Sequence, residues 1–267
     1  MTLILASVSQ SGILVAGDTN VCVSHTVMVK KGLFKKEERV EWPSAFVGHH
    51  SKICVSRSGI CVASLGYMGA AGDWIQEKIE SIVSNSESSF DDLKSTLTDF
   101  LRKQGIEDTT LIIAGYDLLE DGTRKARLER AFMDKSKDHV IDTSKPGILV
   151  DGVWKEVAQR LLCPYTKITK KGKQMCIETS ELDMRTFSID DFARLSLFLI
   201  RATETYLSFT DELSYIGGPV DMILLRPDGQ ASWLIKHNPA TSYDVDLLRT
   251  GDKGHPSIQD SSGEWSI

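Results

Sequence analysis

Short apolar runs separated by turn residues open the chain and predict strands. Leu3–Ala6 and Ile13–Ala16 are aliphatic or β-branched, and the polar stretch Ser9–Gly12 lies between them. Runs of this length, bounded by turn residues, are typical of a buried β-hairpin. If the two strands pair through a normal turn, Thr2 and Asp18 lie near each other at the same end of the hairpin.

The same pattern recurs twice farther along the chain. A second hairpin is predicted around the turn Ser58–Gly59, and a third around the turn Glu120–Thr123. The strands of these two hairpins are Lys52–Arg57 with Ile60–Gly66, and Thr109–Gly115 with Ala126–Asp134.

Helical spacing of apolar residues appears between and after these hairpins. One apolar face follows Gly66, and a second helix is predicted over Phe90–Lys103, with Ser89 as its N-cap. A short helix is expected after Gly152. The stretch Ser188–Phe209 is apolar nearly all round, which predicts a helix enclosed between layers. The first face consists of Ala70, Ala71, Trp74, Ile75, Ile79, Ile82 and Val83.

Two helices between hairpins, followed by two further helices and a closing hairpin, indicate an α+β fold in which helices cover a β-sandwich. We expect one domain over residues 1–237, with insertions at about 30–51 and 136–186. Residues 238–267 are polar and rich in Gly, Ser and Asp, which is typical of a loose tail.

Composition excludes several function classes. The 267 residues are 41% hydrophobic and carry a net charge of −6, so no basic footprint for nucleic acid or an anionic membrane is present. No apolar run approaches the roughly 20 residues of a membrane helix, and no signal peptide is recognisable. The five cysteines include no C-x-x-C pair, and the six histidines show no ligand spacing. We therefore expect a cytoplasmic protein without metal or cofactor, and we interpret His25, His49 and His50 as surface residues.

Thr2 is the candidate nucleophile. It follows Met1 directly, so removal of Met1 places a hydroxyl and a free α-amine on one residue. The α-amine has an ordinary pKa of about 7.7–8.0 and can act as a general base near neutral pH. If Met1 is retained, the amine is part of a peptide bond and the site is inactive.

The opening pattern T-x-x-x-A-x-x-x-x-x-G-(apolar)4-G-D resembles the start of mature proteasome-type β subunits, a family of N-terminal-nucleophile (Ntn) hydrolases. Asp18 lies sixteen positions after Thr2, as in that family, and Lys52 lies fourteen positions before the glycine bend at Gly66. The strand T-L-I-I-A-G-Y-D and the loop G-G-P-V-D resemble the same family. The resemblance implies the αββα sandwich, two antiparallel sheets between helical layers.

The resemblance also implies roles for individual residues. Thr2 would attack a peptide or amide carbonyl, Lys52 would lower the pKa of its hydroxyl, and Asp18 would hold Lys52 in place. The remaining expected roles are an oxyanion hole at Gly66, a modest apolar pocket at Val21, Ser64 and Met68, and orientation of the nucleophile by Asp211 and Ser214. A peptide or protein substrate and a homo-oligomeric ring are the expected partners.

Two departures keep alternatives open. The family carries a serine in the glycine-rich loop before its third helix, whereas this chain reads P-G-I-L-V-D-G-V. Tyr215 and Ile216 are extra residues before Gly217. These departures and the long insertions favour a specialised substrate over bulk degradation. The same acyl-enzyme would serve a peptidyl or acyl transferase (a ligase), and a third alternative is a catalytically silent assembly subunit.

Overall fold

A six-stranded antiparallel sheet contains both ends of the predicted domain. The computed structural model describes residues 2–31, 36–66, 72–106, 109–132, 135–162, 165–170, 173–178, 182–209, 216–237 and 245–247. The strand order is β10-β1-β2-β13-β14-β15. Their bounds are β1 Leu3–Ser9, β2 Gly12–Asp18, β10 Gly147–Gly152, β13 Val220–Leu225, β14 Ala231–His237 and β15 Val245–Leu247.

A second antiparallel sheet has five strands in the order β5-β6-β7-β8-β9. The predicted second and third hairpins both lie in it, joined by the pairing of β6 with β7. Its strands are β5 Ile53–Val55, β6 Cys61–Gly66, β7 Thr109–Leu118, β8 Arg124–Phe132 and β9 His139–Val140.

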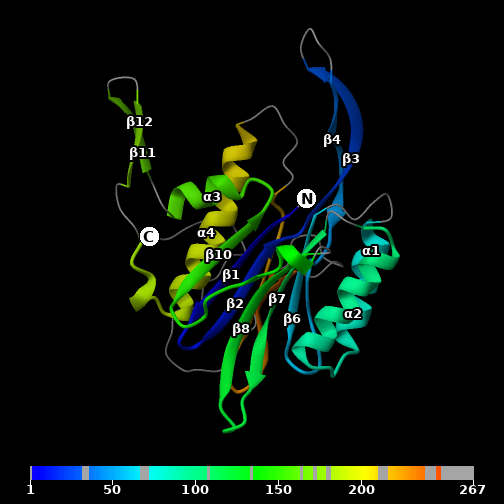
Figure 1. Ribbon diagram of the computed structural model, residues 1–267, viewed down its shortest axis with the longest axis vertical. Helices are drawn as coiled ribbons and strands as arrows, with labels where there is room; N and C mark the ends of the chain where they lie inside the picture. Colours follow the sequence, from blue (N-terminus) through cyan, green and yellow to red (C-terminus); the bar gives the residue numbers. More distant parts are fainter. Residues whose placement is uncertain are drawn as a thin grey trace.

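Two pairs of helices cover the outer faces of the two sheets (Figure 1). Helices α1 and α2 pack on the five-stranded sheet, and α3 and α4 pack on the six-stranded sheet. The architecture is therefore the predicted α+β, αββα sandwich. The helices are α1 Gly72–Ser84, α2 Phe90–Lys103, α3 Lys155–Leu162 and α4 Ile189–Ser208, with short 3-10 turns at Lys135–Lys137 and Met184–Thr186.

Alternation along the strands divides the core into three layers. In β1, Leu3 and Leu5 face α3 and α4, whereas Ile4 and Ala6 face the other sheet. Successive side chains of a strand point to opposite faces, so a strand between two packed layers must be apolar on both. This explains why the opening runs are continuously hydrophobic.

The helix ends follow the predicted capping signals. Ser89 accepts the Asp92 backbone N–H at the start of α2. Ser188 and Asp191 form a capping box at the start of α4. The prediction that α4 is enclosed between layers was wrong: Phe198 is 52% exposed and Phe209, just after the helix, 83%. The apolar residues on this outer side are uncovered in the single chain.

Two hairpins extend beyond the sandwich (Figure 1). Strands β3 (Asn20–Lys31) and β4 (Lys36–His49) pair with each other, as do β11 (Tyr165–Lys170) and β12 (Lys173–Glu178). They fall largely within the two predicted insertions. The proposed domain bounds themselves stay a prediction. Apart from residues 245–247, the predicted tail 238–267 lies outside the described residues.

Candidate active site

The pairing of β1 with β2 places Asp18 beside the start of the chain. Ile4 lies opposite Gly17, and the Leu3 backbone N–H donates to Asp18 Oδ1 at 2.8 Å. Thr2 itself is 4% exposed. The predicted proximity of Thr2 and Asp18 therefore follows directly from the register of the first hairpin.

Lys52 completes an ion pair that joins the two sheets. It directly precedes β5 in the five-stranded sheet, and its Nζ lies 3.0 Å from Asp18 Oδ2. Both side chains are buried. Burial raises the pKa of Asp18, and the opposing effects of Lys52 and the Leu3 N–H only partly offset that rise. The folded structure therefore disfavours the charged form of Asp18.

A tight turn between β10 and α3 fixes the backbone of Thr2 from the other side. The Val153 N–H donates to the Thr2 carbonyl oxygen at 3.0 Å. Gly152 has φ +115°, and a Cβ on it would lie 2.0 Å from that oxygen. Only glycine fits here. The proteasome-type β subunits that the chain resembles carry a serine in this loop. Here the loop contacts Thr2 through the backbone N–H of Val153.

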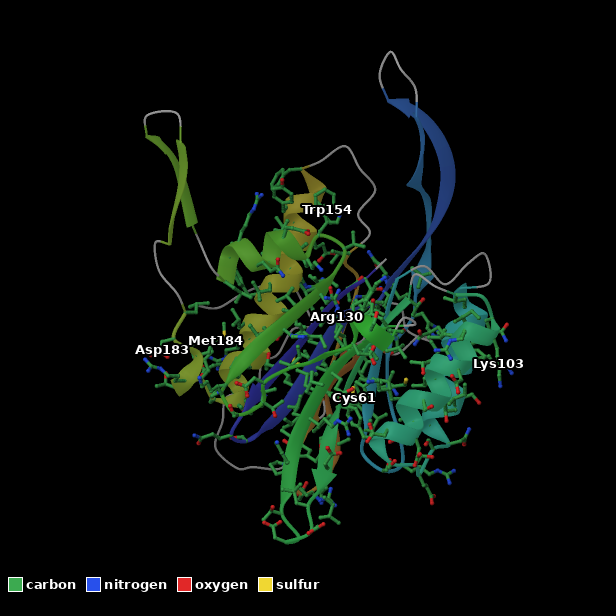
Figure 2. All side chains as sticks on the ribbon, in the orientation of Figure 1. Cys61, Lys103, Arg130, Trp154, Asp183 and Met184 are labelled. Carbon is green, nitrogen blue, oxygen red and sulfur yellow. The ribbon has the colours of Figure 1, made fainter. Side chains whose placement is uncertain are left out.

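Asp151, in the same turn, forms a charged cluster that the sequence did not reveal. It is buried, pairs with Arg130 of β8, and its Oδ1 lies 3.0 Å from Lys155 Nζ at the start of α3. Its Oδ1 also accepts the Gly152 N–H at 2.9 Å. Figure 2 shows Arg130 near the centre of the molecule, between the two helix pairs. The cluster ties the turn beneath Thr2 to both sheets.

The predicted pocket and oxyanion residues are only partly described. Gly66 ends β6 with φ +115°, a conformation that favours glycine. Val21 is half-buried, and Ser64 is buried with its hydroxyl 2.5 Å from Gln76 Oε1 of α1. The polar Gln76 is thus an unpredicted neighbour of Ser64. Met68, Asp211 and Ser214 lie outside the described residues.

The start of β3, the end of β4 and the loop that carries Gly218 gather at the same end of the sandwich. His49 ends β4 opposite Asn20, and the His50 N–H donates to the Thr19 carbonyl at 2.8 Å. A Cβ on Gly218 would lie 2.4 Å from the His49 ring. His49 is half-buried, so the interpretation of this histidine as a plain surface residue needs revision. The pairing of β2 with β13 brings the loop that carries Gly218 to this histidine.

The described part of the chain holds neither a cluster of metal ligands nor a membrane-spanning helix. Within the described residues, no group of three or more His, Cys, Asp or Glu side chains could hold a metal ion. No helix in that part of the chain is long and apolar enough to span a bilayer.

Comparison with known proteins identifies the fold. No family model matches the sequence, and no curated protein matches it. Among solved structures, the chain is similar to an Anbu mutant from Hyphomicrobium sp. strain MC1, with 14% identity, 87% of each chain covered and a TM-score of 0.51. It is also similar to Anbu (ancestral beta-subunit) from Yersinia bercovieri, with 13% identity, 89% of each chain covered and a TM-score of 0.51. At this identity the likeness concerns the fold, which agrees with the predicted proteasome-like architecture.

Proposed function

We propose that this protein is an N-terminal threonine hydrolase that cleaves peptide or amide bonds through an acyl-enzyme. The observation that carries the proposal is the buried Asp18–Lys52 pair, hydrogen-bonded to the residue after Thr2. An ion pair in this position holds a cation near the chain terminus. The Anbu-like fold supports the same reading at the level of architecture.

The proposed reaction begins after Met1 is removed. Thr2 Oγ attacks the carbonyl carbon, and its proton passes to the Thr2 α-amine. Lys52 lowers the pKa of the hydroxyl, and Asp18 holds the lysine in place. Backbone N–H groups at Gly66 accommodate the oxyanion. The leaving amine takes the proton from the α-ammonium, and water then hydrolyses the Thr2 ester to release the acid and regenerate the hydroxyl.

The remaining proposed roles concern the residues around the nucleophile. Asp211 and Ser214 would orient the Thr2 hydroxyl and amine. Val21, Ser64 and Met68 would contact the side chain that precedes the cleaved bond. The Ser64–Gln76 hydrogen bond gives this group a polar part beside the two apolar residues.

Acyl transfer is the second candidate. The turn beneath Thr2 carries the charged Asp151 cluster where the resemblance expects a serine. That difference favours a specialised reaction, in which an amine in place of water resolves the ester. A catalytically silent assembly subunit is the third candidate, and the Asp18–Lys52 pair speaks against it because assembly surface requires no buried charge.

Self-association is part of the proposal. Large apolar side chains are exposed on and beside α3 and α4, and removing such a patch from water favours association. We expect the purified chain to be oligomeric in light scattering, and the double variant Phe198→Ser, Phe209→Ser to have a lower mass. An unchanged mass would exclude this surface as the contact. The exposed residues are Leu161, Leu182, Phe198, Tyr206 and Phe209.

The test is hydrolysis and transfer by matched variants. The wild-type chain, Thr2→Ser, Thr2→Ala and the exposed-helix control Thr96→Ala are incubated with a library of peptide amides, with and without added amine. We expect turnover by wild type and Thr96→Ala, reduced turnover by Thr2→Ser, and a loss of at least about a thousandfold in Thr2→Ala, because the nucleophile is absent. Equal turnover by Thr2→Ala would refute the proposal, and product formed only with added amine would favour the transferase.

A further inference from the structure

A second set of titratable side chains lies beside the Asp18–Lys52 pair and has no role in the proposed reaction. It consists of His49 from β4, Asp221 from β13, His237 from β14 and Glu204 from α4. They come from four elements, of which β4 is far from the other three in the sequence. The pairing of β2 with β13 brings them to the end of the sandwich that carries Asp18.

Asp221 and His237 form a buried acid–imidazole pair. Asp221 lies opposite Gly17, and the preceding residue, Val220, lies opposite Asp18. His237 Nδ1 lies 2.9 Å and 3.0 Å from the two Asp221 carboxylate oxygens, and the His237 backbone N–H donates to the same carboxylate at 2.8 Å. A carboxylate accepts hydrogen bonds, so the geometry assigns a proton to Nδ1.

Glycine makes the space in which the His49 ring sits. A Cβ on Gly218 would lie 2.4 Å from His49 Nδ1 and Cε1, and Gly218 has φ +73°. Helix α4 fixes this glycine. Arg201 donates to its carbonyl oxygen at 3.0 Å, and its N–H donates to Glu204 Oε1 at 3.3 Å. The ring is therefore packed against a loop that is anchored from the helix layer.

The charge of His49 is linked to the charges of the site. Burial lowers the pKa of His49 from its ordinary 6.5, and the nearby charges of His237 and Lys52 lower it further. Asp18 and Glu204 act in the opposite direction. At neutral pH the ring is consequently neutral. A proton added to it would place a second cation within the field of the carboxylate that holds Lys52.

We propose that His49, packed on Gly218 and near the Asp221–His237 pair, is a positioning residue of the Asp18–Lys52 pair. While the His49 imidazole is neutral, Lys52 is the cation that pairs with the Asp18 carboxylate. Protonation of His49 adds a competing cation and loosens the Asp18–Lys52 pair. The role of the pair in catalysis rests on the proposed function. The electrostatic linkage between His49 and the Asp18–Lys52 pair does not rest on the proposed function, because it concerns the charges of these side chains alone.

The first test measures the linkage without any substrate. The imidazole titrations of the full chain are followed by NMR in the wild type, Lys52→Met, Asp18→Asn and His237→Gln. His49 is expected to titrate below 6.5, to move upward by about half a pH unit or more in Lys52→Met and His237→Gln, and to move downward in Asp18→Asn. The exposed His139→Gln variant is the control and should leave the His49 midpoint unchanged.

Opposite signs for the Lys52 and Asp18 variants exclude a merely structural role. A His49 midpoint at or above 6.5 in the wild type, or one that does not respond to any of the three variants, would overturn the proposal. The three variants are independent, so the failure of one to fold leaves the other two decisive.

The second test follows the pH dependence of covalent labelling at Thr2 by a threonine-reactive β-lactone. In the wild type we expect an acid limb governed by both His49 and the Thr2 α-amine, and in His49→Gln a limb governed by the amine alone. The rate at pH 5.5, relative to each protein's own plateau, should be at least about threefold higher in His49→Gln. Labelling with identical acid limbs would overturn the role of His49 and leave the proposed function standing. Linked titrations without labelling at any pH would leave the positioning of the pair standing and refute the proposed function.

Discussion

Two clusters of buried charge in this protein differ in what the fold does to them. One is the Asp18–Lys52 pair beside Thr2. The other, near the second helix, joins Glu129 to Arg127 and Lys94, with Asp91 and Asp138 at its edge. Both are anchored on a carboxylate that is nearly inaccessible to water. They therefore allow the effect of burial to be separated from the effect of pairing.

In the Glu129 cluster, folding favours the charges of Asp91 and Lys94. The hydrogen bond from Arg127 lowers the pKa of Asp91. Burial opposes the charge on Lys94, but hydrogen bonds to Asp138 and Glu129 outweigh it and raise the pKa of the lysine. Arg127 also stacks on the Phe90 ring at 4.1 Å. Several partners for each ion make this a structural connection between α2 and β8.

Folding disfavours the charge of Asp18. One lysine and one backbone N–H are its partners among the interactions described, and burial still raises its pKa. Well-packed apolar residues would stabilise a fold at least as well as such a pair. The contrast agrees with the proposed role of the Asp18–Lys52 pair at Thr2 and with a structural role for the Glu129 cluster.

Removing the cation from Asp18 gives the largest expected effect on stability. Lys52→Met leaves a fully buried carboxylate without its ion partner, and we expect the free energy of unfolding to fall by about 3–5 kcal/mol. Denaturant unfolding at pH 7 measures this change. The control is Lys103→Met, on the outer side of α2 (Figure 2), which should change stability by less than about 0.5 kcal/mol. Equal effects of the two variants would contradict the contrast.

Glu129→Gln probes the structural cluster. It removes charge-assisted hydrogen bonds to both Arg127 and Lys94, so we expect a loss of about 2–3 kcal/mol in the same unfolding assay. The exposed pair Arg57–Glu87 supplies the matched control, and Glu87→Gln should lose less than about 0.5 kcal/mol. Turnover at Thr2 should be unaffected in both. A Glu129→Gln variant that is more stable than the wild type would show that folding disfavours the charge in this cluster as well.

Asp18→Asn should separate stability from function. The amide oxygen can still accept the Leu3 N–H, and the charge that burial disfavours is gone. The Lys52 side chain is 9% exposed, against 0% for the Asp18 side chain. We expect the stability at pH 7 to be unchanged or higher by about 1 kcal/mol, although labelling of Thr2 is largely lost. A loss above about 2 kcal/mol would instead mark the pair as stabilising.

The free energy of unfolding should depend on pH with opposite signs for Asp18 and Asp91. Of the effects predicted here, this one is the smallest. The pKa of Asp18 is raised, so its contribution to stability is present below about 3.8 and is lost as pH rises through its folded value. The pKa of Asp91 is lowered, so its contribution is present above about 3.8 and is lost as pH falls. Comparing Asp18→Asn and Asp91→Asn with the wild type from pH 3 to 6 should give slopes of opposite sign. For the exposed Asp91, solvent screening limits the effect to a few tenths of a kcal/mol. Slopes of the same sign would refute the contrast.

Local patterns were enough to predict the layers, and the resemblance to proteasome-type β subunits implied the ion pair. The hairpins, the capped helices at Ser89 and Ser188, and the Thr2, Asp18 and Lys52 spacings are all readable over short stretches of chain. Continuous apolar runs mark the strands that are buried on both faces, and with the order of helices and hairpins they indicate the αββα fold that the structure has.

Two of the charged pairs that the sequence did not reveal depend on tertiary contacts between strands. Arg130 meets Asp151 across the sandwich, and His237 reaches Asp221 only because β13 and β14 pair. No periodicity encodes such contacts. The prediction that α4 is enclosed between two layers failed for another reason. The apolar residues on its outer side predicted a second packed layer, which the single chain does not supply.

The intact mass of the purified protein, before and after treatment with an epoxyketone or β-lactone, tests the central claim most directly. We expect the mass of a chain that begins at Thr2, increased by one inhibitor after treatment, with no increase in Thr2→Ala and little in Lys52→Ala. A chain that retains Met1, or a processed chain that remains unlabelled, would contradict the catalytic account and favour a silent assembly subunit.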